Sequence, residues 1–248
     1  MNKKRVGAWF LFLFFGFCLI NPTLAESSEF RQAEVDPWES VNRKIFQFNQ
    51  FVDTYLFKPV AQGYRLVTPS IVDKGVTNIF NNIDDIKTVA NSLLQFKVRK
   101  AVLSTGRVMF NSTFGVFGFF DVATYFGLQR SPEDLAQVLA HWGVGKGYYL
   151  VLPVLGPSTT SDAPARLVEM AFLEPLGFLI DDDTTRYALV GLKYVDLRAD
   201  LIVKEGLIVG DKYSFVRNAY LQYRNYLNND GVVEDPFALE EEDYLDDF

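Results

Sequence analysis

A stretch rich in phenylalanine and glycine, within residues 107–157, constrains the fold of this 248-residue chain more than any other feature. Its central part places four phenylalanines around two glycines: Phe114, Gly115, Phe117, Gly118, Phe119 and Phe120. Each glycine inside a helix costs about 0.5–1 kcal/mol relative to alanine, so the pattern needs a reason. Either the rings face lipid, or the glycines let a packed helix approach closely, and the residues alone leave both interpretations open. The four phenylalanines are therefore candidate membrane-facing residues.

The first 25 residues have the parts of an export signal. A basic start at residues 3–5 precedes an almost unbroken apolar stretch over residues 9–20, and Thr23-Leu-Ala25 fits a small-x-small cleavage site. We therefore expect residues 1–25 to be removed by cleavage between Ala25 and Glu26. The mature protein would then begin at Glu26.

The only cysteine of the chain, Cys18, lies inside this signal. A lipoprotein signal needs a small residue directly before the cysteine, and Phe17 stands there instead. We expect Cys18 to leave with the signal, so that the mature chain is unlipidated. It would then contain no disulfide and no cysteine-ligated metal site.

The mature chain is acidic, and most of its excess charge lies at one end. Loss of three basic residues with the signal changes the formal net charge from -7 to -10. Eight acidic residues lie after residue 233, in a segment that has no Lys or Arg. The preceding body is nearly neutral, so a nucleic-acid partner is not expected. We predict a flexible leader over residues 26–35 and an acidic disordered tail over residues 231–248.

The chain is unusually aromatic, with 23 phenylalanines and 12 tyrosines. Beyond the signal, however, no segment has the roughly 18 uninterrupted apolar residues of a spanning helix. An exported, aromatic-rich chain of this kind is typical of a protein embedded in a membrane interface. An ordinary periplasmic domain with an aromatic core is the alternative.

Helical periodicity dominates residues 36–230 and predicts a single all-α domain with little strand. Asp36-Pro-Trp-Glu39 is expected to cap a first helix that ends near Pro59. Asn42 and Asn49 share one flank of that helix. Separate helices are predicted before and after Asp84, while residues 148–155 are expected to be extended and residues 157–162 to form a turn.

Three possible chemical sites have simpler structural interpretations. His141, the only histidine, lacks a Gly-x-Ser-x-Gly elbow and is expected to be packed or hydrogen-bonded. Asp181-Asp-Asp183 lacks the spacing of a calcium loop and is expected to be a solvated linker and helix cap. The loop over residues 143–147 lacks the phosphate-loop spacing. We therefore expect no catalysis and no bound cofactor or metal.

Several clusters of residues match one known family. The first joins Asp36-Pro-Trp-Glu39 to Asn42, Arg43, Phe46, Phe48 and Asn49. The last runs from Trp142 to Ser158, and the matches between them include Asn78, Asn82, Arg107, Asn111, Gly115, Gly118 and Asp121. Over about half its length the chain resembles the MlaA (VacJ) family of outer-membrane phospholipid-transport proteins.

This resemblance implies a ring-shaped all-α protein that lies in the periplasmic leaflet of the outer membrane and encloses an amphipathic channel. The implied function is to remove phospholipids from the outer leaflet and so to maintain lipid asymmetry, without chemical catalysis. The implied partners are phospholipid, a trimeric outer-membrane porin, and a periplasmic lipid carrier linked to an inner-membrane ABC transporter.

On the same basis we expect seven residues to shape and gate the channel: Asn42, Phe46, Phe48, Asn49, Gly143, Gly145 and Gly147. The chain departs from the family at Phe17, at residues 135–140 and at Ser161, which puts lipidation and local loop geometry in question. Two alternatives stay open. The protein could be an envelope phospholipase that uses His141, or a structural porin-associated protein that binds no lipid.

The signal makes a direct prediction. Mass spectrometry of protein extracted from outer membranes should find Glu26 as the first residue, because the cleavage site after Ala25 fits better than lipidation at Cys18. A triacylated Cys18 would contradict this prediction.

Overall fold

The computed structural model describes residues 35–232. The predictions for Cys18, for cleavage between Ala25 and Glu26, for nearly all of the leader and for most of the acidic tail therefore lie outside the described residues.

Helices make up most of the described chain. The longer ones are α3 (Glu39–Val52), α4 (Lys58–Val67), α5 (Ser70–Leu94), α6 (Val98–Thr113), α11 (Asp183–Lys204) and α12 (Lys212–Asn228). The shorter ones are α7 (Val122–Tyr125), α8 (Leu135–His141), α9 (Asp162–Val168) and α10 (Leu176–Leu179). Two strands, β1 (Tyr149–Leu152) and β2 (Gly156–Thr159), pair antiparallel as a hairpin.

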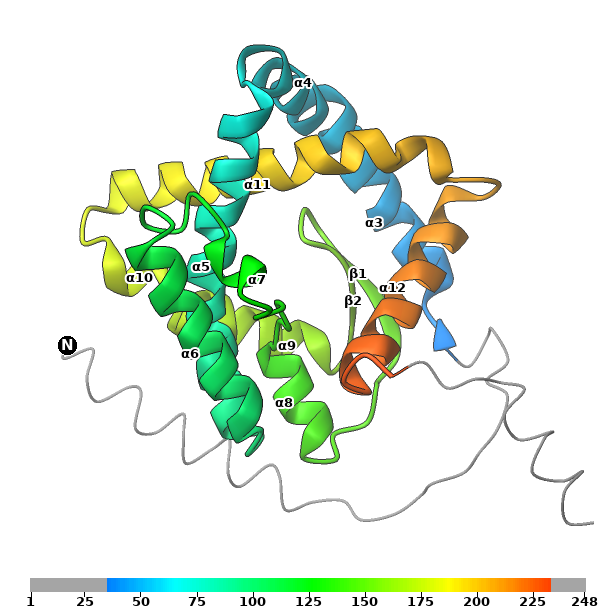
Figure 1. Ribbon diagram of the computed structural model, residues 1–248. Helices are drawn as coiled ribbons and strands as arrows, with labels where there is room; N and C mark the ends of the chain where they lie inside the picture. The colour runs from blue at the N-terminus through cyan, green and yellow to red at the C-terminus, as the bar shows by residue number, and fades with distance from the viewer. Residues whose placement is uncertain (1–34, 233–248) are drawn as a thin grey trace, which may run out of the picture.

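The helices are arranged as a ring (Figure 1). α4 and α11 lie along one side, α5 and α6 form another, and α3 and α12 lie across the opening from them. The β1–β2 hairpin reaches into the middle of this ring. The predicted ring-like all-α fold with little strand is confirmed. Within residues 35–232, no helix is both long and apolar enough to cross a bilayer.

The first helix does not end at Pro59, and that prediction is wrong. A π-helical turn, Asp53–Phe57, joins α3 to α4, and the Lys58 N–H donates to the Asp53 carbonyl. Pro59 lies in the first turn of α4, directly after the π-helical turn. The wider turn therefore lets the chain continue as helix past the proline.

Asp36 is not a helix cap either. Trp38 occupies the cap position of α3, without a side-chain cap bond. Asp36 is instead buried and accepts hydrogen bonds from Asn42 Nδ2 at 2.8 Å, from Arg217 Nη1 at 3.2 Å and from the Tyr213 hydroxyl. Arg217 and Tyr213 of α12 therefore donate to the carboxylate that the sequence pattern predicts to cap the backbone of α3.

α5 is one continuous helix, whereas the sequence predicts two. Polar side chains at a spacing of three residues run along one face of it and are buried: Asn82, Asp85, Thr88 and Asn91. In the sequence these residues look like an interruption. In the structure they form a stripe that faces the neighbouring elements, which we call the α5 polar stripe.

Apolar burial is limited and divided. One cluster joins Leu135, Val138 and Ala165, and the other joins Tyr149, Val151 and Tyr213. Among the described residues, buried polar and charged side chains outnumber buried apolar ones. Polar contacts must therefore supply much of the specific contact between elements.

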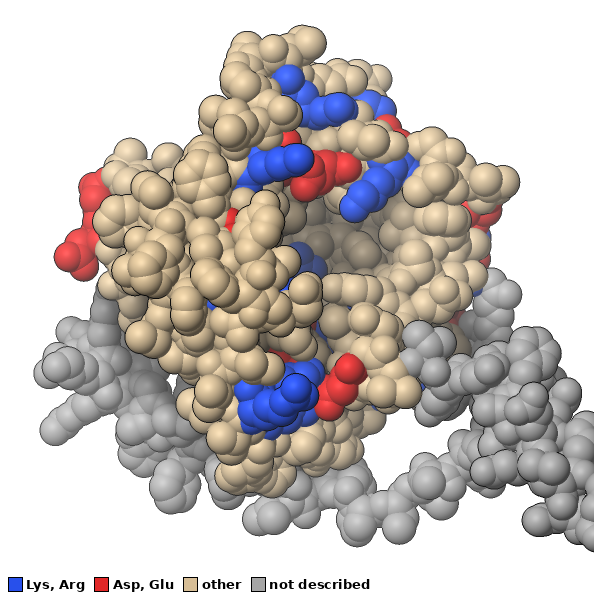
Figure 2. All heavy atoms as spheres, in the orientation of Figure 1, with Lys and Arg blue, Asp and Glu red and all other residues tan. Residues whose placement is uncertain are grey.

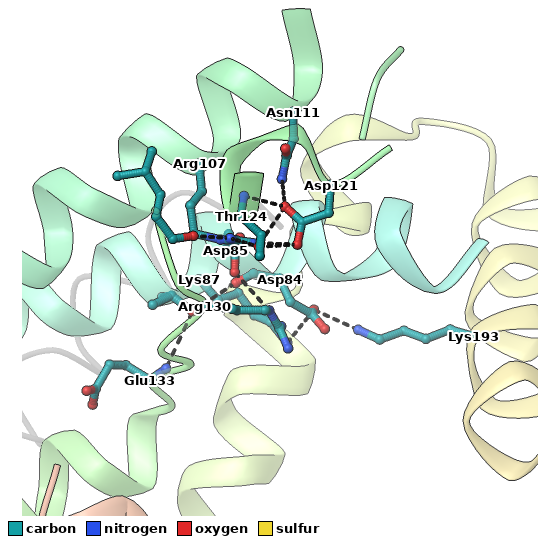
Figure 3. Close-up of polar contacts among 12 residues, drawn as sticks. Asp84, Asp85, Lys87, Arg107, Asn111, Asp121, Thr124, Arg130, Glu133 and Lys193 are labelled. Atoms are coloured by element: carbon teal, nitrogen blue, oxygen red, sulfur yellow. Dashed lines mark hydrogen bonds and ion pairs between the residues drawn. The ribbon is translucent and has the colours of Figure 1, made fainter. Parts of the chain in front are cut away.

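One of the deeply buried contacts centres on Arg107 of α6 (Figure 3). Its Nε lies 2.9 Å from Asp85 Oδ2 of the α5 polar stripe, and its Nη2 lies 3.1 Å from Asp121 Oδ2. Thr124 accepts another bond from Arg107 at 3.0 Å. One guanidinium therefore fastens α5, α6 and α7 together.

Replacing this arginine should destabilise the ring. Arg107→Gln removes a buried positive charge beside the buried Asp85 and the half-buried Asp121, so we expect a loss of about 3–5 kcal/mol in the free energy of unfolding. Arg130→Gln is the matched control, because Arg130 also pairs with Asp85, at 3.0 Å, but its side chain is 29% exposed. Arg107 still neutralises Asp85 in that variant, so the loss should be less than half as large. Denaturant unfolding of detergent-purified protein measures both, and equal losses would contradict the assignment.

Candidate functional site

The hairpin inside the ring is fastened to α3 by two asparagines. Asn42 is buried; its Nδ2 donates to the Tyr149 carbonyl at 3.2 Å and its Oδ1 accepts from the Val151 N–H at 2.9 Å. Asn49 repeats this two turns later, donating to the Leu152 carbonyl at 2.8 Å and accepting from the Val154 N–H at 2.7 Å. Asn42 and Asn49 are seven residues apart, which is nearly two full turns of a helix, so both side chains lie on the same face and reach the first strand and its end.

The two phenylalanines predicted with them lie in different places. The Phe46 ring contacts the Tyr213 ring edge-on, with a centroid distance of 5.5 Å, and packs against the Tyr149–Val151–Tyr213 cluster. Phe48 is exposed. Phe46 therefore supports the hairpin from behind, whereas Phe48 lies on the surface of the ring.

The three predicted glycines belong to the segment that leads from α8 into β1. Gly147 has a φ of +68°, and a Cβ there would lie 2.4 Å from Thr160 Oγ1 and 3.0 Å from the Ser161 nitrogen. Gly143 also has a positive φ, of +87°, while a Cβ at Gly145 would meet no atom within 4 Å. Gly147 is thus required by close packing, and Gly143 by its backbone conformation.

The phenylalanine–glycine stretch separates into inward glycines and mostly outward rings. A Cβ at Gly118 would lie 2.7 Å from the Cβ of Asn82 on α5, so this glycine permits close contact with a packed helix. Phe114, Phe117 and Phe120 are exposed. Phe119 is half-buried, with its ring over Gly75, where a Cβ would lie 2.1 Å from the ring.

A cavity of about 490 Å³ is lined by residues of α5, α8, α9, α12 and the hairpin. Its lining includes both acids and bases, of which Asp84, Asp162, Glu169, Lys87, Arg166 and Arg224 concern the argument below. A space-filling view shows a hollow at the centre of the ring, with charged side chains gathered around it (Figure 2). Polar groups therefore face the interior of a ring whose surface carries many apolar side chains.

Two carboxyl groups of the cavity, Asp84 and Glu169, have pKa values shifted in opposite directions. Burial disfavours the charged form of Asp84, but Lys193 and Lys87 outweigh that effect and lower its pKa; Lys193 Nζ lies 2.7 Å away (Figure 3). Burial raises the pKa of the Glu169 carboxyl, and Lys87 and the Asn91 amide at 2.9 Å offset this only in part. Asp84 thus has firm cationic partners, while Glu169 is less readily ionised.

The other predicted sites are simple structural features, with one correction. His141 is exposed, with its ring edge-on to Trp142 at 6.1 Å, so the expectation of a packed ring is wrong. It follows the end of the apolar face of α8, where no element covers it. Asp182 accepts from the Thr185 N–H at 2.7 Å and caps α11, as predicted. Residues 35–232 contain no group of side chains that could hold a metal ion.

Sequence reasoning missed several residues that build the site. Arg224 of α12 bonds Asp134 at 2.6 Å and pairs with Asp162 at 3.2 Å, which joins α12 to α8 and α9. Arg166 lines the cavity and contacts the hairpin. The signal for these residues in the sequence was an arginine among the apolar residues of a predicted helix. That pattern does not distinguish an exposed arginine from a buried one.

Known proteins provide a comparison. The family model "MlaA lipoprotein" matches residues 34–227. The intermembrane phospholipid transport system lipoprotein MlaA of Escherichia coli is 31% identical, over 90% of this chain and 91% of its own. Its counterpart in Haemophilus influenzae is 30% identical, over 82% of this chain and 84% of its own.

The fold has a match among solved structures as well. One described as "Structural basis for maintenance of bacterial outer membrane lipid asymmetry" superposes with a TM-score of 0.67 at 27% identity, and covers 78% of this chain and 98% of that one. Sequence, family model and fold agree, and the chain belongs to the MlaA lipoprotein family.

Proposed function

We propose that this protein takes phospholipids out of the outer leaflet of the outer membrane and passes them toward a periplasmic carrier, and so maintains lipid asymmetry. The observation that carries the proposal is the ring itself, which has polar groups around a central hollow and many apolar side chains on its surface (Figure 2). A phospholipid crossing an apolar layer needs its head group shielded from that layer. A ring with a polar interior supplies such a shield.

The apolar surface supports a position in the membrane interface. Large apolar side chains that are more than two-thirds exposed include Phe114, Phe117, Tyr125, Leu66 and Val67. Exposed apolar area on this scale is characteristic of contact with lipid or with a partner protein. We propose that Phe114, Phe117, Phe119 and Phe120 face lipid, with Phe119 contributing least, and that the ring lies in the periplasmic leaflet.

The hairpin supports a place for control of lipid passage. Asn42 and Asn49 hold its first strand, and Gly143, Gly145 and Gly147 lie in the segment that leads into that strand. We propose that these residues gate the channel, with Phe46 as a support and Phe48 as a surface contact.

The proposed partners are phospholipid, a trimeric porin and a periplasmic lipid carrier that serves an inner-membrane ABC transporter. Transport of this kind breaks no covalent bond, so we propose that the protein is not an enzyme. The phospholipase alternative needs an activated His141, which has neither a hydrogen bond nor an ion pair with any described residue.

Loss of the protein should disturb the outer leaflet. Deleting the gene should raise the amount of phospholipid that an added phospholipase can hydrolyse on intact cells, and restoring the full chain should return it to the starting level. The proposal fails if the restored chain reaches the outer membrane and exposed phospholipid stays high. Free fatty acid or lysophospholipid released by the purified protein would favour the enzyme instead.

Deleting Asn49 should misregulate lipid flow. The deletion rotates the residues beyond it by about 100° around the helix axis and removes both bonds to the hairpin. Asn49→Ala is the matched control, because it removes the same bonds without the rotation. We expect a larger change in exposed phospholipid for the deletion than for the substitution, at equal protein levels in the outer membrane. Unchanged exposed phospholipid in both would contradict the gating role.

A further inference from the structure

One arginine on the cavity wall has no acidic partner. Arg166 projects from α9, is half-buried and lines the cavity of about 490 Å³. Its Nη1 donates to the Leu155 carbonyl, in the turn of the hairpin, at 3.0 Å. In the described part of the chain, no carboxylate forms an ion pair with it.

The other basic groups of this cavity are already neutralised. Arg224 is paired with Asp134 and Asp162, and Arg130 is paired with Asp85 at 3.0 Å. Lys87 lies 3.2 Å from Asp84 and 3.5 Å from Glu174. An anion that enters the cavity would therefore find its free counter-charge at Arg166.

Three acidic residues of the cavity wall have hydrogen-bond or ion-pair partners other than Arg166. Asp162 is held by Arg224 and by the Tyr220 hydroxyl at 2.7 Å, and Asp84 is held by Lys193. Glu169 lies three residues after Arg166 without forming an ion pair with it, and its carboxylate accepts a hydrogen bond from Asn91 Nδ2 at 2.9 Å instead. The positive charge of Arg166 is therefore not cancelled locally.

The geometry of the guanidinium suits an anion that presents two oxygens, as a phosphate does. An arginine carries five N–H donors in a planar fork, and the hairpin carbonyl holds one side of that fork in place. The remaining N–H groups have no hydrogen-bond partner among residues 35–232. They can donate to two oxygens of one phosphate, a strong and directional arrangement. The cavity volume lies in the range of about 300–1,000 Å³ that small-molecule sites occupy.

We propose that Arg166 binds the phosphodiester of a phospholipid head group inside this cavity. The inference rests on the proposed function, because it names the group that receives the transported lipid. It makes Arg166 a lipid-binding residue that orients the head group while the acyl chains follow.

Lipid binding to the purified full chain tests this. Dioleoylphosphatidylglycerol should bind the parent protein more tightly than dioleoylglycerol, which has the same acyl chains and no phosphate. Arg166→Gln should weaken phosphatidylglycerol binding about 10- to 100-fold and leave dioleoylglycerol binding nearly unchanged, since a charge-assisted bond is lost. Arg166→Lys should give an intermediate affinity, because it keeps the charge without the planar fork.

The matched control is Arg65→Gln, which changes an exposed arginine on α4 that does not line the cavity. It should leave both affinities unchanged. Equal phosphatidylglycerol affinity in Arg166→Gln and the parent would overturn the inference alone. Failure of the parent to bind any phospholipid would overturn the proposed function as well.

Two further outcomes decide the source of the phosphate and the role of folding. If inorganic phosphate competes with the lipid at equal concentration, the site is a simple anion site and the lipid assignment fails. If Arg166→Gln lowers the thermal midpoint of unfolding, its weaker lipid binding no longer isolates the lost contact, and Arg166→Lys is used instead. A phosphatidylglycerol affinity of Arg166→Lys equal to that of the parent would overturn the proposed fork geometry.

Discussion

Ion pairs and amide contacts between helices hold this ring closed, and the rest of the structure depends on them. A ring around a hollow cannot collect its apolar side chains in one central core, because its centre must stay open. The two apolar clusters among residues 35–232 are small and separate. Arg107 with Asp85, Arg198 with Asp53 at 2.8 Å, and Arg224 with Asp134 instead fasten successive joints of the ring. Such pairs are directional, so they favour one register between neighbouring helices, whereas apolar contact would hold the helices together in many registers.

The α5 polar stripe shows how the same residues serve both the joints and the interior. Asp85 anchors Arg107 and Arg130, and Asn91 bonds the Glu133 carbonyl and Glu169. Thr88 lies between them in sequence and lines the cavity. Because polar groups are already required along this helix to close the ring, the interior is polar without a second set of side chains. The apolar residues are left for the outer surface, the reverse of an ordinary water-soluble domain.

The hairpin depends on the ring for its position. A two-stranded hairpin is marginally stable by itself, and β1–β2 is short even for a hairpin. Asn42 and Asn49 on one side and Arg166 on the other hold its backbone, and they come from helices far apart in the sequence. The proposed head-group contact at Arg166 therefore lies beside the element that the proposed gate would move. In this proposal, lipid binding and the position of the hairpin depend on one guanidinium.

Local patterns in the sequence determined the class of structure. Helical periodicity predicted the all-α fold and placed Asn42 and Asn49 on one flank of the first helix. The family resemblance supplied the ring and the transport function. Only the tertiary structure decided that Asp36 pairs with Arg217 instead of capping α3. It also decided that α5 continues without a break through its polar residues and that Arg166 has no acidic partner among the described residues. The physical reason is that each outcome depends on which donor or acceptor a distant helix brings within hydrogen-bond distance, and no spacing along one segment contains that information.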